Sequence, residues 1–227
     1  MPNLDILFED NHLIAINKRS GDIVQGDKTG DVPLSEHIKE FLREKYNKQG
    51  NVYCGVIHRI DRPVSGVVIF AKTSKALERM NKLIHDRQIH KRYWAIVKNP
   101  PAKPKDNLVH YLHKDERKNK AIVSKIQKDG YIRAELNYEL IASSEHYHLL
   151  DIELITGRHH QIRSQLSAIG SPIKGDLKYG FPRSNPDASI SLHARSISFL
   201  HPVTQQETTI IAPPPTDKLW GWFLECM

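Results

Sequence analysis

Two patterns meet in the stretch His58-Arg59-Ile60-Asp61-Arg62-Pro63-Val64-Ser65-Gly66-Val67-Val68-Ile69-Phe70-Ala71-Lys72. The first half is polar and places Asp61 between two arginines, whereas Val67 to Ala71 is apolar and β-branched and predicts a buried strand. Pro63 and Gly66 indicate a turn between the halves, because proline fixes φ and glycine tolerates a positive φ. We therefore expect Asp61 on a loop that leads directly into the core, where protein scaffolds place reactive groups.

The residues around Asp61 suggest two roles for its carboxylate. Arg59 and Arg62 are its near neighbours in sequence, and a nearby cation favours the ionised form of an aspartate. An ionised aspartate is a poor proton donor but a competent nucleophile or charge stabiliser. The alternative is a surface ion pair that closes a loop, since most neighbouring aspartates and arginines have no chemical role. The stretch alone leaves both readings open.

Size, charge and cysteine content bound the class of protein. The chain has 227 residues, enough for one large domain or two small ones, and its 33 basic against 26 acidic residues give a net charge of +7. That charge suits a polyanionic partner, nucleic acid first, although a basic protein of another kind fits it equally well. A mean hydropathy of −0.49 and the absence of a long apolar run predict a soluble protein without a membrane span. Because the start lacks a signal-peptide pattern and Cys54 and Cys226 lie far apart, we expect free thiols in the cytoplasm.

A second informative block is His90-Lys91-Arg92-Tyr93-Trp94-Ala95-Ile96-Val97-Lys98. Its side chains alternate as in a strand, and its basic residues lead into two aromatic ones. Aromatic rings beside cations are how proteins hold unstacked bases. The alternative is that Tyr93 is an ordinary core aromatic.

The third block is Thr156-Gly157-Arg158-His159-His160-Gln161-Ile162-Arg163-Ser164-Gln165-Leu166. Its apolar residues share one face of a predicted helix that Gly170 ends. Arg163 lies beside that face, and a buried arginine needs a carboxylate partner. The adjacent His159 and His160 raise the question of a metal site, but no third ligand follows at a zinc-like spacing, so we expect no metal.

The remaining patterns predict about eight strand-like and four helical stretches. The 99–130 segment is Lys-rich; Pro100, Pro101 and Pro104 predict a connector at its opening, and Ala121 to Ile126 predicts a strand. The segment is either a solvated face or a nucleic-acid contact. The other expected elements are a hairpin over 6–18, a loop over 22–33, a helix capped by Ser35, a helix capped by Thr73 or Ser74, strands over 131–142, 147–155 and 191–202, and a last helix capped by Thr216.

The three blocks together resemble the signatures of RluA-type RNA pseudouridine synthases. His58 to Gly66 resembles the catalytic signature, Lys-x-Tyr-x-Ala-x-Val the second block, and Thr-Gly-Arg-x-His-Gln-Ile-Arg is the strongest match. The likeness extends over about residues 6–215, with the blocks in the expected order. The chain departs from the pattern at Val64, where the family usually has threonine, at Arg19, where it has proline, and at Asn99, near which it has glycine.

The resemblance implies a fold, an activity and site residues. The implied fold is α+β, a mixed, mostly antiparallel sheet with flanking helices and an RNA-binding cleft, formed by residues 1–227 as a single catalytic domain without an N-terminal S4 domain. Asp61 is expected to be the catalytic aspartate, Tyr93 to pack against the target base and assist proton removal, and Arg163 to pair with Asp61. The expected substrate-binding residues are Arg59, Arg62, Ile162, His160 and Arg158.

The implied activity is isomerisation of specific uridines in ribosomal or transfer RNA to pseudouridine. No redox step or hydrolytic water is involved, so no metal or organic cofactor is expected. We expect a cytoplasmic monomer whose partner is RNA. Two other classes stay open: an RNA-binding or ribosome-assembly factor without chemistry, against which Asp61, Tyr93 and Arg163 argue, and a carboxylate-dependent hydrolase. A carboxylate-dependent hydrolase would require a second acidic residue near Asp61, and no motif in the sequence supplies one.

Overall fold

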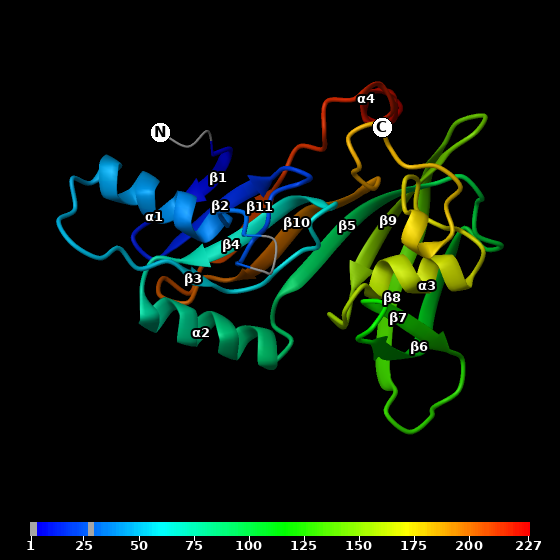
Figure 1. Ribbon diagram of the computed structural model, residues 1–227, viewed down its shortest axis with the longest axis horizontal. Helices are drawn as coiled ribbons and strands as arrows, with labels where there is room; N and C mark the ends of the chain where they lie inside the picture. The colour runs from blue at the N-terminus through cyan, green and yellow to red at the C-terminus, as the bar shows by residue number, and fades with distance from the viewer. Residues whose placement is uncertain (1–3, 27–29) are drawn as a thin grey trace. The chain divides into compact units, whose positions relative to one another are not determined.

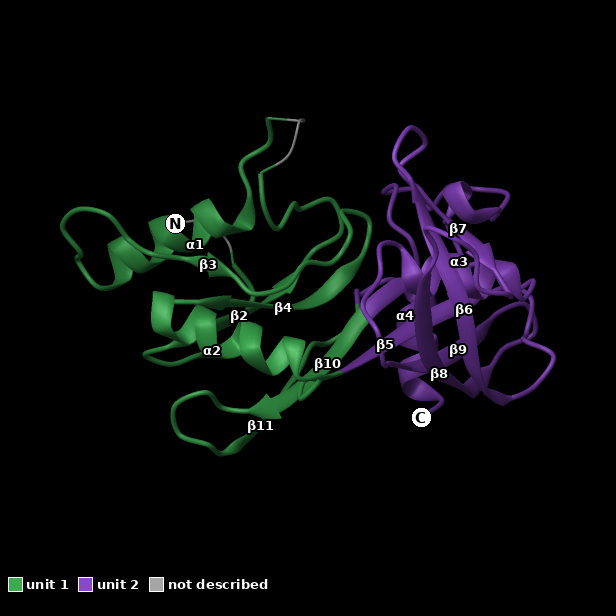
Figure 2. Ribbon diagram, turned by 90° about the horizontal axis from the view of Figure 1, so that it is seen from below, with its two compact units in different colours: residues 1–90, 194–214 green, residues 91–193, 215–227 purple. Residues whose placement is uncertain are grey.

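The computed structural model describes residues 4–26 and 30–227 and divides the chain into two compact units. Unit 1 consists of residues 1–90 and 194–214, and unit 2 of residues 91–193 and 215–227 (Figure 2). Strand β10 (Leu192–Leu200) contributes residues to both. Each unit consists of two separate segments of the chain, so neither is continuous in sequence.

Unit 1 is built on strands in the order β1-β2-β4-β10, and every pair whose register is described is antiparallel (Figure 1). The predicted hairpin over 6–18 is confirmed, and the Asp10 carboxylate fixes its turn by accepting the N–H groups of His12 and Leu13 at 2.8 and 2.7 Å. The strands are β1 (Ile6–Glu9), β2 (Leu13–Lys18), β3 (Gly55–Val56), which pairs with β4 (Ser65–Ala71), and β11 (Glu207–Ile211), which pairs with β10.

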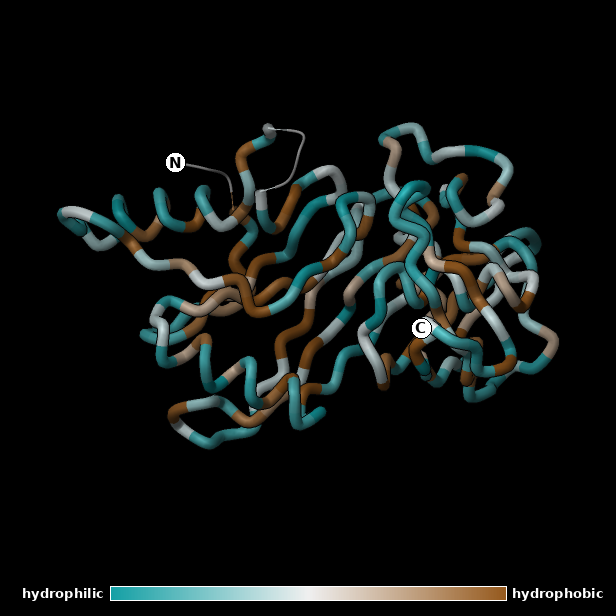
Figure 3. Tube along the Cα trace, turned by 60° about the horizontal axis from the view of Figure 1, so that its bottom comes forward, coloured by the Kyte–Doolittle hydropathy of each residue, from teal (hydrophilic) through white to brown (hydrophobic). Residues whose placement is uncertain are grey.

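Every residue of β4 is buried, which confirms the predicted buried strand. Helices α1 (Leu34–Lys45) and α2 (Ser74–His85) lie on opposite sides of β2 and β4, so each face of these strands has a cover (Figure 2). On the α2 side, Val67 and Ile69 share a core with Met80 of the helix. Figure 3 shows that hydrophobic residues are concentrated along the strands and hydrophilic residues in the loops.

The two predicted helix caps of unit 1 have different outcomes. Thr73 caps α2 as predicted, because its Oγ1 accepts the N–H of Ala76 at 3.1 Å. The prediction for Ser35 is wrong: α1 begins at Leu34, and the N-cap residue is Pro33, which has no side-chain acceptor. Ser35 therefore lies inside the first turn.

Gly66 allows β4 to approach its neighbour β10 closely, and we expect its replacement to lower the stability of the fold. Its φ is +115°, and an added Cβ would lie 2.3 Å from the backbone oxygen of Ala194. Gly66→Ala should lower the free energy of unfolding by about 3 kcal/mol, from backbone strain and the overlap together. Chemical denaturation measures this. Gly21→Ala is the matched control, because Gly21 has a φ of +95° but open space around it; equal losses in the two variants would refute the close approach.

Unit 2 is an antiparallel sheet in the order β5-β9-β8-β6-β7 (Figure 1). The opening of the 99–130 segment is a connector as predicted, because no helix or strand lies between Val97 and Lys105. The expected strand near Ala121 is confirmed, whereas the eleven-residue strand Lys105–Asp115 was not predicted. The elements are β5 (His90–Val97), β6 (Lys105–Asp115), β7 (Lys120–Ser124), β8 (Ile132–Ser143), β9 (His148–Leu154), α3 (Gln161–Ala168), the 3-10 helix η1 (Leu177–Tyr179) and α4 (Lys218–Glu225).

The register divides this sheet into two chemically different faces. Residues directly opposite each other in antiparallel strands share a face. One face is apolar and carries Tyr93, Ile152 and Tyr138 in one row. The opposite face carries polar pairs such as Arg92 with Asp151 and is covered at one end by α4, whose Phe223 packs against the core.

The last helix starts one residue later than predicted. Asp217, not Thr216, is the N-cap of α4, and its carboxylate accepts the N–H groups of Leu219 and Trp220, both at 2.9 Å. The sheet and helices together confirm the predicted α+β class, with eleven strands and four α-helices in residues 4–26 and 30–227.

Candidate functional site

Asp61 lies on the loop between β3 and β4, as predicted. The N–H of Val64 donates to the backbone oxygen of Asp61 at 3.0 Å, which closes a turn immediately before β4. The Asp61 side chain is half-buried. Arg59 and Arg62 on either side are exposed, and Arg62 forms an ion pair with Asp31 at 2.8 Å. That pair joins two exposed side chains, so it contributes little to stability.

A buried lysine supports the Asp61 loop. Lys18, at the end of β2, is 1% exposed, and its Nζ donates to the backbone oxygens of Arg19, Asp22 and Arg62 at 2.8, 2.8 and 3.0 Å. Burial lowers the pKa of Lys18 to about 8, while the negative charges of Asp22 and Asp61 act in the opposite direction. The ammonium therefore joins the 19–22 loop to the Asp61 loop and lies within electrostatic reach of the carboxylate.

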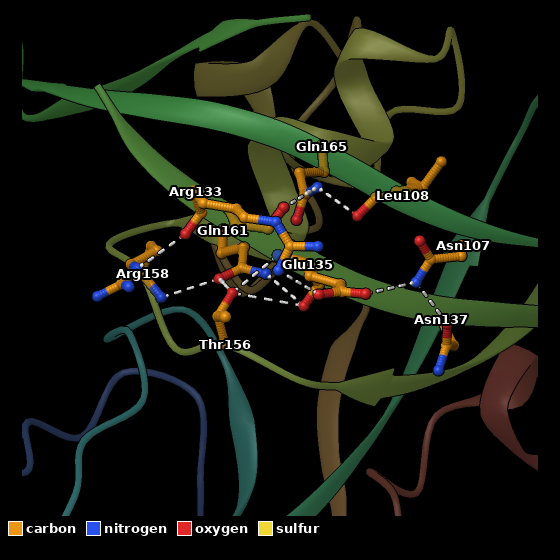
Figure 4. A network of polar contacts seen from close by, with 10 residues as sticks. Asn107, Leu108, Arg133, Glu135, Asn137, Thr156, Arg158, Gln161 and Gln165 are labelled. Carbon is orange, nitrogen blue, oxygen red and sulfur yellow. Dashed lines mark hydrogen bonds and ion pairs between the residues drawn. The ribbon is translucent and has the colours of Figure 1, made fainter. Parts of the chain in front are cut away.

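In unit 2, the loop before α3 is fixed to strand β8 by a polar network (Figure 4). The Thr156 hydroxyl donates to the side-chain oxygen of Gln161 at 2.8 Å, and that oxygen also accepts the backbone N–H of Arg158 at 2.9 Å. The side-chain amide of Gln161 donates to the backbone oxygen of Glu135 at 3.0 Å. The network thereby sets the start of α3 and leaves the exposed Arg158 beside it, with its Nε on the backbone oxygen of Arg133.

Arg163 is buried in α3 and binds a carboxylate that the sequence did not indicate. Its Nε and Nη2 donate to the two oxygens of Asp176 at 2.7 and 2.9 Å, and the two residues are 5% and 1% exposed. The guanidinium carbon also lies 5.1 Å from the centre of the Tyr179 ring. This is the bidentate geometry in which an arginine and a carboxylate compensate each other's burial.

His160 and Ile162 lie at the beginning of the same helix. His160 is the N-cap of α3 with a positive φ of 49°, and its Nδ1 lies 2.9 Å from the hydroxyl of Tyr179. Its ring stacks on that of His159 with centroids 3.8 Å apart, and Ile162 is 5% exposed. Across residues 4–26 and 30–227, no three metal-ligating side chains come together as a metal site would require.

Tyr93 lies on the apolar face of the unit 2 sheet. It is 7% exposed and directly opposite Ile152 of β9. Helix α3 lies over the same face, because the Gln165 side chain contacts the ring of His110 at 3.0 Å and His110 is opposite the buried Ala134. Tyr93 and the helix that carries Arg163 therefore belong to one side of this sheet.

The predicted site residues are distributed over both units. Unit 2 brings Tyr93, Arg158, His160, Ile162 and Arg163 to the sheet face or to the start of α3, and unit 1 carries Asp61, Arg59 and Arg62. Sequence reasoning missed Lys18, Asp176 and Tyr179. A buried arginine requires a carboxylate partner, so the sequence indicated that Arg163 would have one. It did not indicate that this partner is Asp176.

The lysines of the 99–130 segment have two kinds of surroundings. Lys103 and Lys105 are exposed and pair with Asp106 and Glu139 at 3.1 and 3.0 Å. Lys120 lies over the ring of Tyr179 at 5.0 Å, at a hollow of about 360 Å³ between β7 and α3. The segment thus combines a solvated, ion-paired edge with a lysine held against the aromatic ring that also contacts Arg163.

Two findings concern membrane-spanning helices and the cysteines. In the described part of the chain, no helix has the length and apolar character needed to cross a bilayer. Cys54 and Cys226 are free thiols, as predicted, and burial raises the pKa of Cys54 to about 12. A thiol with so high a pKa is a weak nucleophile near neutral pH.

The sequence is similar to a family of known proteins over most of its length. The family model described as RNA pseudouridylate synthase matches residues 12–168. An uncharacterised RNA pseudouridine synthase of Synechocystis is 32% identical, over 93% of this chain and 66% of that protein. Ribosomal large subunit pseudouridine synthase C of Buchnera aphidicola is 33% identical, over 92% and 67%, and tRNA pseudouridine synthase C of Pasteurella multocida is 29% identical, over 96% and 93%.

Solved structures give the same fold. The human protein named RNA pseudouridylate synthase domain containing 4 aligns with a TM-score of 0.80 at 22% sequence identity, covering 96% of this chain and 91% of that one. The human protein named RNA pseudouridylate synthase domain containing 1 aligns with a TM-score of 0.75 at 18% identity. These alignments confirm the expected fold.

Proposed function

This chain belongs to the RNA pseudouridylate synthase family, and from that premise we infer that it isomerises specific uridines of ribosomal or transfer RNA to pseudouridine. The observation that carries the proposal is the family match over residues 12–168, which spans the Asp61 loop, β5 and α3. Pseudouridine is an isomer of uridine, so the reaction requires no redox partner and the scheme uses no cofactor. We further propose that residues 1–227 act as a single catalytic domain, as a monomer in the cytoplasm.

We propose Asp61 as the catalytic residue, with its ionised carboxylate paired to Arg163. Its position on a short turn that enters a fully buried strand restrains the carboxylate, and Lys18 holds the loop through a hydrogen bond to the backbone oxygen of Arg62. A guanidinium remains charged at every physiological pH, so a buried arginine is a dependable counter-ion for an aspartate that must stay ionised. The Nε and Nη2 groups of Arg163 are held by Asp176, which orients the side chain.

The proposed reaction begins with a uridine that leaves its stack, at a cost of a few kcal/mol. Asp61 then attacks C1′ or abstracts the proton at C2′, and the bond between C1′ and N1 breaks with its electron pair going to the uracil. The freed uracil turns and C5 bonds to C1′. This step displaces the Asp61 carboxylate if the carboxylate had attacked C1′, or occurs with return of the proton to C2′ if that proton had been abstracted. Loss of the C5 proton, with uptake of a proton at N1, completes an isomerisation in which all atoms balance.

The other proposed residues bind and position the substrate. Tyr93 packs against the target base and assists removal of the C5 proton, and Ile162 contributes an apolar wall beside it. Arg158 and Arg62, both exposed, contact the phosphates. Arg59 helps to expel the base or fills the space that it leaves, and His160 holds the start of α3 through Tyr179.

Tritium release tests the proposed function directly. The protein is incubated with ribosomal and transfer RNA transcripts that contain uridine tritiated at C5, and the tritium that enters the solvent is counted. A pseudouridine synthase releases one tritium for each uridine converted, and the modified positions can then be mapped. Binding of both RNAs without any release of tritium would refute the proposal and favour an RNA-binding protein without chemistry.

A further inference from the structure

Lys91 lies two residues before Tyr93 on the same face of β5. Successive side chains of a strand point to opposite faces, so Lys91 and Tyr93 project to one side, about 6.7 Å apart along the strand. Lys91 is opposite Leu154 of β9, which in turn is opposite Leu136 of β8. Leu136 is fully buried, so the ammonium belongs to an otherwise apolar row.

No residue in the described part of the chain pairs with this ammonium. Lys91 is only partly exposed, and its Nζ makes no hydrogen bond or ion pair with any of those residues. Its neighbour Arg92, on the opposite face of the same strand, is paired with Asp151. A partly buried charge without a partner lowers stability, and such groups are retained where a ligand supplies the missing charge.

We propose that Lys91 is a substrate-positioning residue whose ammonium binds a phosphate of the RNA, next to the nucleotide whose base lies against Tyr93. This proposal rests on the proposed function, because it takes the Tyr93 face as the base-binding side. The separation of Lys91 and Tyr93 along β5 is within the size of one nucleotide. A phosphate would give the ammonium the opposite charge that the protein itself does not supply.

The protonation behaviour of Lys91 agrees with this role. Burial lowers the pKa of Lys91 to about 8 in the free protein. The free protein therefore loses this charge as the pH rises through about 8, and a bound phosphate, which favours the charged form, raises the pKa again. RNA binding should accordingly take up a proton near pH 8 and weaken at higher pH.

The test measures binding of a uridine-containing single-stranded oligoribonucleotide as a function of salt. Lys91→Gln should weaken binding about tenfold and lower the slope of log K against log salt by about 0.7, the value for one phosphate contact on a single strand. The control is Lys105→Gln, which makes the same charge change at an exposed lysine of the opposite face that is paired with Glu139. This control should leave the slope unchanged.

Two further readouts separate ligand binding from a structural role. Because the ammonium has no partner in the free protein, Lys91→Gln should melt at the same temperature as the wild type or a few degrees higher. Between pH 7 and about pH 9, wild-type affinity should fall by up to about tenfold, whereas Lys91→Arg should keep its affinity because arginine does not titrate there. A Lys91→Gln protein with an unchanged salt slope, or one that melts clearly lower, would overturn the proposal.

This experiment also separates the failure of the inference from the failure of the proposed function. Binding is measured whether or not tritium is released. If the wild type releases tritium and the Lys91→Gln slope is unchanged, only the role of Lys91 is wrong. If the slope changes as expected but no RNA yields tritium, the phosphate contact stands and the isomerase assignment falls.

Discussion

Replacement of Asp61 by asparagine is expected to lower tritium release about 10⁴-fold or more, because asparagine can neither attack C1′ nor accept the 2′ proton. The substitution changes one oxygen to an amide nitrogen, so the turn closed by Val64 should persist. Single-turnover release of tritium from tritiated transcripts measures the loss without interference from product release.

Two comparisons make the Asp61 result specific. Asp129→Asn makes the same chemical change at an exposed position before β8 and should retain full activity. The melting temperature of Asp61→Asn should match that of the wild type within about 2 °C, so that lost activity cannot be ascribed to unfolding. Near wild-type activity in Asp61→Asn would remove the proposed role of this residue.

The second large effect concerns the buried pair of Arg163 and Asp176. Asp176→Asn removes one charge and leaves the guanidinium of Arg163, only 5% exposed, without its bidentate partner. Breaking a buried ion pair at one side costs about 3–5 kcal/mol. For a chain of this size that corresponds to a fall in melting temperature of about 6–20 °C, which calorimetry or denaturant unfolding detects.

A double variant distinguishes the lost pair from simple damage to packing. Arg163→Met with Asp176→Leu removes both charges and should recover much of the stability, because apolar residues of similar volume replace buried ion pairs at little cost. Glu139→Gln, which breaks the exposed pair with Lys105, should cost less than about 1 kcal/mol. A double variant as unstable as Asp176→Asn would contradict this account.

Local patterns were enough to predict most elements of unit 1. Two apolar runs on either side of a turn-prone stretch predicted the 6–18 hairpin, and a continuous apolar, β-branched run predicted β4. Cap positions were less reliable. Thr216 and Asp217 are adjacent and both suit a cap, so only the folded path of the chain decides which carboxylate or hydroxyl reaches the free N–H groups.

The parts that the sequence did not predict depend on tertiary contacts. β6 follows Pro100, Pro101 and Pro104 and is rich in charged residues, so its composition resembles a connector; its pairing with β8 makes it a strand. Asp176 lies thirteen residues after Arg163 in a turn-rich segment, and the register of a helix does not show which loop returns to its side. Patterning predicted most elements and the resemblance implied the fold class, but neither indicated that Asp176 holds Arg163.

The contacts of Lys18 have one more consequence. An ammonium carries three hydrogens in a tetrahedral arrangement, and here each has its own carbonyl oxygen. The side chain therefore acts as a tethered monovalent cation, coordinated by main-chain oxygens of the 19–22 loop and of Arg62, which lies about forty residues further along the chain. A planar guanidinium has five donors and a different shape, so arginine at this position would leave donors unsatisfied and spread the oxygens apart. Lysine, unlike arginine, can therefore hold the 19–22 loop and the Asp61 loop together through one small charged group.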